Sequence, residues 1–313
     1  MLDHLWESAA GKITEKIAAS AVPALVFWLG GALAWAYSRG GFTSLKEPAK
    51  WLGKQPGAIQ AILAVAVLVG LTATGILVRR LTLSALPLLE GYWPRCLKSL
   101  SGRLISRKQK KAQGEAERLQ ELAGPVFSGA ASPEQIAEFH KLDRRRRRRP
   151  SDPRHLLPTR LGNILRSAES LPTDKYGLDL VVIWPRLWLL LPDATQRELT
   201  TARNAIDQTV SCCVWGLFFL LFSPWALWVI PIGLAIAVAS TWWWLPNRAE
   251  IFADLLEATI DLHRTAIYRQ LRWPLPTDPA AEQAQGQRLT TYLMRGSDDT
   301  NPHFAPDQDV PPP

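Results

Sequence analysis

Long stretches of apolar residues without a charged side chain constrain this chain more than any other feature. Ile17–Tyr37 is one such stretch, and Ala58–Val78 is another that ends at Arg79-Arg80. A helix rises about 1.5 Å per residue, so about 20 apolar residues cross a hydrocarbon core roughly 30 Å thick. Both stretches therefore predict membrane-spanning helices. The length of the first, with a second span close behind it, argues against a cleaved signal peptide.

A third apolar block, Val210–Leu245, is too long for one span and is interrupted at Ser223-Pro224. It predicts a tight hairpin of two helices, from about Asp207 to Phe222 and from Trp225 to Leu245; a re-entrant hairpin is the alternative. Tryptophans mark both ends of the last helix, as in an aromatic belt at two membrane interfaces: Trp225, Trp228, Trp242, Trp243 and Trp244. The expected fold is mainly α, an integral membrane protein with four transmembrane helices in two hairpins and a mostly helical cytosolic module.

Basic residues near the helix ends predict the orientation. The second hairpin has no Lys or Arg in its loop, whereas Arg197 and Arg203 precede it and Arg248 follows it. The first hairpin shows a narrower excess on its flanks. Both place the N- and C-termini in the cytoplasm, and the net charge of +8 favours an anionic bilayer face as a partner.

Small residues recur at helix-packing spacing in the apolar stretches. The ridges are Ala66, Gly70 and Thr74; Gly30 and Ala34; and Gly233 and Ala237. Such ridges let helix backbones approach closely, either within one chain or between subunits. The apolar stretches contain no ionisable residue, which argues against a proton relay or a coupled ion transporter.

The chain divides into six expected segments. They are an N-terminal membrane hairpin (1–78), basic amphipathic helices with an Arg-rich linker (79–156), a compact cytosolic segment (157–207), the second membrane hairpin (208–245), C-terminal cytosolic helices (246–296) and a disordered tail (297–313).

A basic amphipathic helix follows the first hairpin. Leu97, Leu100 and Leu104 share one of its faces, and the basic residues lie largely off that face: Lys98, Arg103 and Arg107. This pattern suits a surface of anionic lipid headgroups. Packing on the protein's own cytosolic part is the alternative interpretation.

Ser132-Pro133-Glu134-Gln135 is typical of a helix start with a capping box. We expect that helix to stop before the six arginines Arg144–Arg149 and the arginines to form a solvated linker attracted to anionic lipid. Nucleic acid is not an expected partner, because no aromatic stacking platform is interleaved with the run.

Four further elements are expected in the cytosolic part. Val181–Trp188 is a buried strand or an interfacial segment, and a helix that starts near Asp193 runs into the third span. Ala249–Arg272 forms an amphipathic helix, and Asp278-Pro279 begins a last helix that ends before Gly296. The apolar side of the amphipathic helix consists of Phe252, Leu255, Leu256, Leu262 and Ile267.

Three motif stretches in the second half of the chain carry a family resemblance. They read Leu157–Asn163 with Tyr176-Gly177-x-Asp179 and Trp184–Leu187; Asp254-Leu-Leu with Asp261-Leu-x-Arg264 and Ile267-Tyr268; and Glu282-x-x-x-Gly286 with Leu289-Thr-x-Tyr-Leu-x-x-Gly296. Here the chain resembles an uncharacterised bacterial family of multi-pass membrane proteins. The resemblance implies a bacterial inner-membrane protein with a cytosolic domain, and it implies no activity.

The sequence predicts no enzyme, no cofactor and no metal site. It lacks the H-E-x-x-H, phosphate-loop and G-x-S-x-G motifs, and its five histidines have no metal-ligand spacing with one another or with a cysteine.

The best candidate site is a group of polar residues close in sequence among apolar ones: Arg160, Asn163, Tyr176, Asp179 and Arg186. One interpretation is a structural network in which Asp179 pairs with Arg186 or Arg160. The other is a pocket for an anionic ligand or a partner peptide.

Taken together, these patterns favour a non-enzymatic inner-membrane adaptor, sensor or effector whose cytosolic face meets an unknown protein partner. The alternative is a homo-oligomeric pore or membrane-perturbing effector. Its lumen would be lined by the hydroxyl groups of Thr72, Thr74, Thr209 and Ser211.

Overall fold

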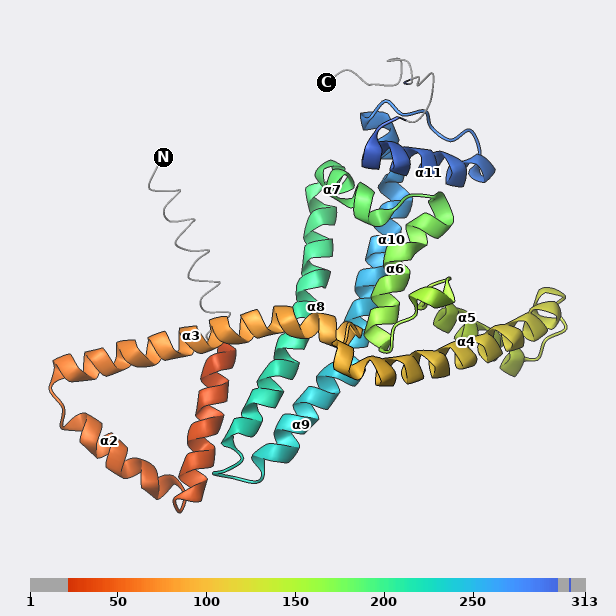
Figure 1. The fold of residues 1–313 in the computed structure, drawn as a ribbon. Helices are drawn as coiled ribbons and strands as arrows, with labels where there is room; N and C mark the ends of the chain where they lie inside the picture. The colour runs from red at the N-terminus through yellow and green to blue at the C-terminus, as the bar shows by residue number, and fades with distance from the viewer. Residues whose placement is uncertain (1–21, 298–303, 305–313) are drawn as a thin grey trace. The chain divides into compact units, whose positions relative to one another are not determined.

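The computed structural model describes residues 22–297 and Phe304 (Figure 1). All regular secondary structure in this part of the chain is helical, which confirms the mainly α class. The predicted tail falls almost wholly outside the described residues, as does Ile17–Ala21 at the start of the first predicted span.

The chain forms two compact units. The first comprises the described residues through Leu86 together with Asp207–Leu245, and we call it the apolar unit. The second comprises Pro87–Ile206 and the described residues from Pro246 onward, and we call it the helical module. Both predicted hairpins belong to the apolar unit, and the divisions lie near the ends of those hairpins.

Within the described residues, three helical stretches are long and apolar enough to cross a membrane, whereas the sequence predicted four spans. They lie within Gly57–Phe127, Asp193–Phe222 and Val229–Gln270. The first predicted span is described only as the shorter apolar helix Val22–Ser38. Between it and α3 (Gly57–Glu90) lie a 3-10 turn, η1 (Phe42–Leu45), and a short helix with exposed apolar side chains, α2 (Lys46–Gly53).

The second predicted hairpin is built from several helical pieces. In order along the chain they are α8 (Asp193–Phe219), η4 (Leu220–Phe222), α9 (Val229–Ala239), the π-helical turn η5 (Ser240–Trp244) and then α10 (Leu245–Gln270). The expected helix near Asp193 does continue without a break into the third apolar stretch.

Glycines set the closest helix packing in the apolar unit. A Cβ atom built on Gly233 would lie 2.7 Å from the Gly216 carbonyl oxygen, and one on Gly216 would lie 2.9 Å from the Gly233 carbonyl oxygen. A Cβ on Gly30 would lie 2.5 Å from the Phe219 ring. By contrast, Gly70 has open space around it. Two of the three predicted small-residue ridges therefore pack within the chain. In the third ridge Thr74 accepts a hydrogen bond from the Trp28 ring nitrogen at 3.3 Å, whereas Gly70 is exposed.

Helix α3 runs past Arg79-Arg80, where its apolar stretch ends, and stops at Glu90. Gly91 then adopts a positive φ of 105°, and the amides of Gly91 and Tyr92 both donate to the Pro87 carbonyl. A glycine is suited to this left-handed position, because the Cβ atom of any other residue would crowd the neighbouring backbone there.

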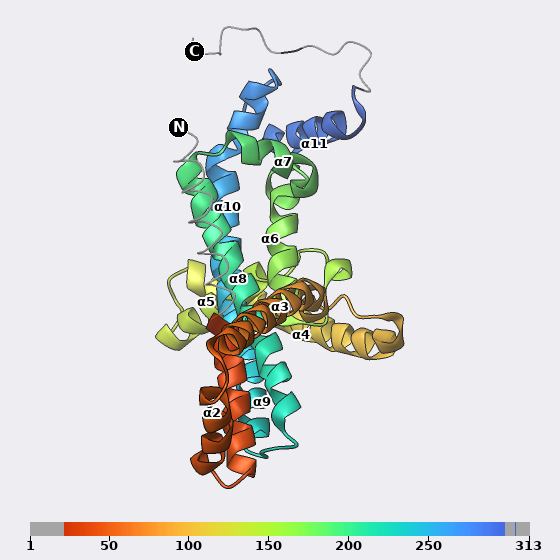
Figure 2. The same ribbon diagram turned by 90° about the vertical axis from the view of Figure 1, so that its left-hand side faces the viewer.

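The helical module contains α4 (Lys98–Phe127), α5 (Pro133–Arg147), α6 (Arg160–Tyr176), α7 (Leu180–Leu190), α11 (Pro279–Arg295), two 3-10 turns, η2 (Arg95–Leu97) and η3 (Pro153–His155), and parts of α8 and α10. Helices α4 and α5 pack as a pair around Leu119, Leu122 and Leu142. Helix α6 runs alongside α10 in the same direction, as both views show (Figures 1 and 2).

The capping box at Ser132 is confirmed. The Ser132 hydroxyl accepts a hydrogen bond from the Gln135 amide, and the Gln135 side chain accepts one from the Ser132 amide. The linker prediction for the arginines is wrong, because α5 continues through Arg147. Positive charge at a helix C-terminus is favourable with respect to the helix dipole. Arg147 also pairs with Asp143 one turn earlier, at 3.0 Å.

The strand prediction for Val181–Trp188 is also wrong, because this segment forms α7. The Asp179 side chain caps the helix by accepting from the Val181 amide, and Ile183 and Leu187 bury their side chains. The last helix, α11, starts with Asp278 as its N-cap and ends before Gly296, as expected. In α10, Leu262 is 75% exposed and does not belong to the buried apolar side.

Candidate functional site

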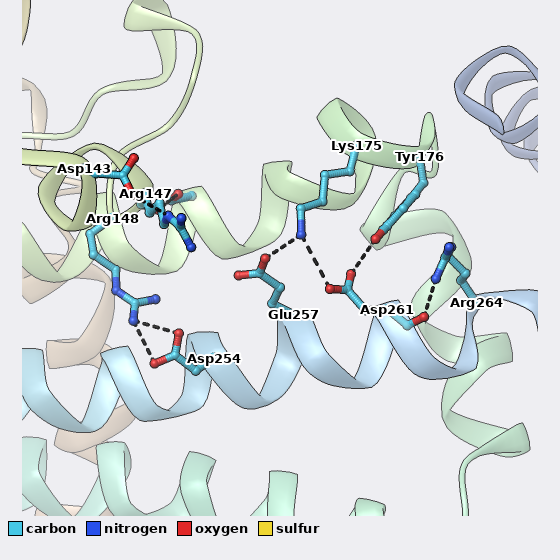
Figure 3. Close-up of polar contacts among 10 residues, drawn as sticks. Asp143, Arg147, Arg148, Lys175, Tyr176, Asp254, Glu257, Asp261 and Arg264 are labelled. Atoms are coloured by element: carbon cyan, nitrogen blue, oxygen red, sulfur yellow. Dashed lines mark hydrogen bonds and ion pairs between the residues drawn. The ribbon is translucent and has the colours of Figure 1, made fainter. Parts of the chain in front are cut away.

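A line of charged residues runs along one face of α10. Glu250, Asp254, Glu257, Asp261 and Arg264 follow one another at spacings of four, three, four and three residues. Residues three and four apart lie on the same face of a helix. We call this face the charged stripe, and Figure 3 shows four of its five residues with their partners.

The N-terminal part of the stripe binds two arginines. Arg148, which follows the last turn of α5, donates from Nη2 to both carboxylate oxygens of Asp254 at 2.7 Å (Figure 3). Arg160, the first residue of α6, donates from Nη2 to Glu250 Oε1 at 2.8 Å. The starts of α6 and of the stripe are thereby held together, and the end of α5 is held beside them.

The middle of the stripe binds the last turn of α6. Lys175 Nζ lies 2.5 Å from Glu257 Oε1 and 3.5 Å from Asp261 Oδ2, and the Tyr176 hydroxyl donates to Asp261 Oδ1 at 2.7 Å (Figure 3). Partial burial opposes the charge on Lys175, but the hydrogen bond to Glu257 and the negative charges of Glu257 and Asp261 together outweigh it, so the pKa of Lys175 is raised. Burial and the bond to Asp261 raise the pKa of Tyr176, so its hydroxyl stays protonated and remains a donor.

Arg264 ends the stripe and reaches α11. Its Nε donates to Glu282 Oε1 at 2.7 Å, and its Nη1 donates to the Asp261 carbonyl. The guanidinium carbon lies 4.2 Å from the centre of the Tyr176 ring, which is close enough for a cation–π contact. The stripe therefore connects α10 with α6, with α11 and with the residue that follows α5.

The five predicted site residues do not form one network. Arg160 and Tyr176 contact the stripe. The Asn163 side chain binds the loop before α6 instead, where its Oδ1 accepts from the Leu157 amide and its Nδ2 donates to the Leu157 carbonyl. Asp179 caps α7, and its amide donates to the Thr290 hydroxyl. Arg186 donates to the Val182 carbonyl within α7 at 2.7 Å. The expected pairing of Asp179 with Arg186 or Arg160 is not formed.

An apolar pocket of 660 Å³ opens between α6, α7, α8 and α10 in the helical module. Leu165, Trp184, Trp188 and Phe252 are among its apolar walls, and its polar residues include Glu90. Burial raises the pKa of Glu90; Glu169 adds to this rise and Arg203 opposes it. The pocket has the size and lining of a site for an apolar group beside a polar one.

Reasoning from single residues missed Glu257 of the stripe and two of the stripe's partners, Lys175 and Glu282. A signal was present, because the acidic residues of α10 recur with helical spacing. The pattern gave no indication of which helix they would meet. Among the residues that the structure describes, no group of three His, Cys, Asp or Glu side chains is placed to hold a metal ion.

The chain matches no family model, and neither a curated protein nor a solved structure is significantly similar to it. The family resemblance noted in the motifs therefore stays a prediction.

Proposed function

We propose that this chain is a non-enzymatic multi-pass protein of a bacterial cytoplasmic membrane. It has four spans and cytoplasmic termini, and it acts as an adaptor, sensor or effector through its helical module. The observation that carries the proposal is the charged stripe, which joins α10 to α6, to α11 and to the end of α5.

The stripe supports a transmitting role, because α10 continues the apolar helix before it. Val229–Gln270 is one uninterrupted helical stretch of 42 residues. A rotation or shift that enters α10 along this helix changes the contacts with α6 and α11 together. Such a helix links the state of an apolar segment to the surface that the module presents to a partner.

The first turns of α4 support contact with anionic lipid headgroups. Leu97 is 41% exposed and Leu100 is 46% exposed, and Lys98, Arg103 and Arg107 are exposed as well. Exposed leucines beside exposed basic residues suit a bilayer surface better than packing on the module.

The native mass of the complex extracted gently from its own membrane tests the proposal. We expect a second protein in a fixed ratio to this chain. A complex made of this chain alone would refute the adaptor role.

A charge swap then tests whether the stripe matters for that complex. Lys175→Glu places like charges at Glu257 and Asp261, and we expect it to release the second protein. The double variant Lys175→Glu/Glu257→Lys restores opposite charges and should recover the complex. Arg154→Glu, a reversal at a largely exposed residue whose partner is the nearby Asp152, is the matched control and should leave the complex intact. Equal complexes in all three variants would show that the stripe has no part in partner binding.

One observation favours the alternative of a homo-oligomeric pore. Only 11% of the 18-residue apolar segment within Gly57–Phe127 is buried within the chain, and the open space at Gly70 leaves room for close approach by a second copy. A homo-oligomer in the native-mass measurement, with ion flux from liposomes that contain the purified protein, would favour the pore over the adaptor role. Absence of flux from a demonstrably assembled oligomer would refute the pore hypothesis.

A further inference from the structure

The arginine run contributes to a second pocket, of 610 Å³, which is distinct from the apolar pocket. It lies within the helical module between α4, the C-terminal part of α5, the first turn of α6 and Glu250 of α10. Of the described residues that line it, eight are Lys or Arg, and Glu250 is the only acidic one. We call it the basic pocket.

Four of the eight basic side chains have a carboxylate partner. Arg145 Nη1 lies 3.1 Å from Glu115 Oε1, and Arg149 Nη2 lies 2.6 Å from Glu115 Oε2. Arg148 pairs with Asp254, and Arg160 pairs with Glu250. These four pairs share three carboxylates, so even the paired half of the pocket carries an excess positive charge.

The other four basic side chains are Lys108, Lys111, Lys141 and Arg144, and none of them makes an ion pair with a described residue. Eight cations against three carboxylates leave the pocket with a net charge of about +5 at neutral pH. Like charges held this close repel one another, so a bound anion stabilises them.

Lys108 is the most strongly affected of the unpaired group. Its side chain is half-buried, and burial, Arg149 and Lys111 together lower its pKa to about 8. The lysine lies where positive charge is unfavourable in the absence of a ligand, as expected of a residue that receives an anion.

We propose that the basic pocket binds a compact, multiply charged phosphate group. Several guanidinium forks with nearby ammonium groups match phosphate oxygens in charge and in hydrogen-bond geometry. The described residues that line the pocket include no aromatic side chain on which a base would stack, which disfavours a single-stranded nucleic acid. The phosphate group belongs either to a lipid headgroup or to a soluble polyphosphate, since both offer the same chemistry. This site is separate from the adaptor role and does not depend on it.

The test uses the full chain in nanodiscs of neutral phosphatidylcholine, titrated with tripolyphosphate in a calorimeter. The pocket variant Lys108→Gln/Lys111→Gln/Arg144→Gln removes three unpaired cations and leaves every ion pair of the pocket in place. We expect it to weaken tripolyphosphate binding at least about tenfold. The matched control Lys110→Gln/Arg269→Gln/Arg288→Gln removes the same charge from exposed side chains outside the pocket and should change binding less than about twofold.

A conservative variant separates a failure to bind from a failure to fold. Lys108→Arg/Lys111→Arg/Arg144→Lys keeps the charge of the pocket and should bind tripolyphosphate within a few-fold of the natural chain. No binding by the natural chain would overturn the proposal. Equal losses in the pocket variant and the control variant would also overturn it, because they would show general charge attraction. Tighter binding of a single-stranded oligonucleotide than of tripolyphosphate would contradict the phosphate assignment.

Nanodiscs that contain phosphatidic acid distinguish the two sources of the phosphate group. If a lipid headgroup occupies the pocket, these discs weaken tripolyphosphate binding by competition, and residual tripolyphosphate binding by the pocket variant is the same in both kinds of disc. If the ligand is soluble, binding to the natural chain is the same in neutral and anionic discs. Either result supports the proposed chemistry. The measurement needs no protein partner, so its outcome is independent of the adaptor role.

Discussion

The Tyr176 hydroxyl donates a hydrogen bond of 2.7 Å to Asp261 Oδ1 and so fixes the end of α6 on α10. The same ring lies beneath the Arg264 guanidinium, 4.2 Å from its carbon, and Arg264 in turn holds Glu282 of α11. One aromatic side chain thus lies where three helices of the module meet.

Removal of this hydroxyl should weaken the module. A hydrogen bond to a charged partner contributes about 1.5–3 kcal/mol, and partial exposure of the pair puts this one near the lower end. We expect Tyr176→Phe to lower the free energy of unfolding by about 1.5 kcal/mol while keeping the ring contact with Arg264. Denaturant unfolding of the full chain in detergent, followed by tryptophan fluorescence, measures it. Tyr92→Phe, at an exposed ring, is the control; an equal loss there would contradict the assignment.

Gly286 of α11 should not accept any side chain. A Cβ atom at this position would overlap the Tyr176 carbonyl oxygen at the end of α6. Since that obstacle is backbone, the helices must separate to admit a methyl group. We expect Gly286→Ala to destabilise the module by about 1–3 kcal/mol, as measured by the same unfolding experiment. Gly114→Ala in the exposed part of α4, where a Cβ meets nothing, should be neutral or stabilising.

The apolar unit offers a similar pair of glycines. In Gly233→Ala the new methyl carbon would lie 2.7 Å from the Gly216 carbonyl oxygen, so α8 and α9 must move apart. We expect a loss of about 1–3 kcal/mol in a detergent unfolding assay. Gly70→Ala places its methyl group in open space and should cost nothing in the monomer. If Gly70→Ala nevertheless changes the native mass of the complex, the exposed side of α3 at Gly70 meets a second copy.

Binding of tripolyphosphate should weaken as pH rises above about 8. The pKa of free Lys108 is lowered to about 8, and a bound anion raises it, so binding near this pH takes up a proton. Above pH 8 this protonation costs increasing free energy, and below it Lys108 is already charged. The charged groups around Lys108 are Lys111, Glu115, Lys141, Arg144, Arg145, Arg148, Arg149, Arg160 and Glu250. The expected fall is roughly a few-fold between about pH 7.5 and about pH 9.

Calorimetry in two buffers of different ionisation enthalpy measures the proton uptake directly. Lys108→Arg is the control, because arginine stays charged over this range and its pH profile reports only the ligand and the other groups. If the natural chain and Lys108→Arg give the same pH profile, Lys108 does not contact the anion.

Local signals predicted much of the fold. The capping box at Ser132, the Asp278 start and Gly296 end of α11 and the run of α8 into an apolar helix are all as expected, because each depends on residues a few positions apart. Apolar length likewise identified three helices that are suited to a membrane.

Long-range contacts account for what was wrong. Arg145 and Arg149 meet Glu115, about 30 positions earlier in the chain, and Arg148 meets Asp254, so the arginine run is part of a packed site instead of a linker. The branched residues of Val181–Trp188 indicate a strand locally, but capping by Asp179 and burial of Ile183 and Leu187 favour a helix. Spacing within one segment does not say which distant segment it meets.

The alternating spacing of the charged stripe makes α10 sensitive to its length more than to its composition. One residue inserted between Asp254 and Glu257 would turn everything after it by about 100° and carry Asp261 and Arg264 away from their partners, whereas seven inserted residues would nearly restore the face. Related chains should therefore tolerate substitutions on the exposed side of this helix and reject single insertions and deletions. Within α10, the number of residues between the charged side chains is under stronger constraint than the identity of most individual residues.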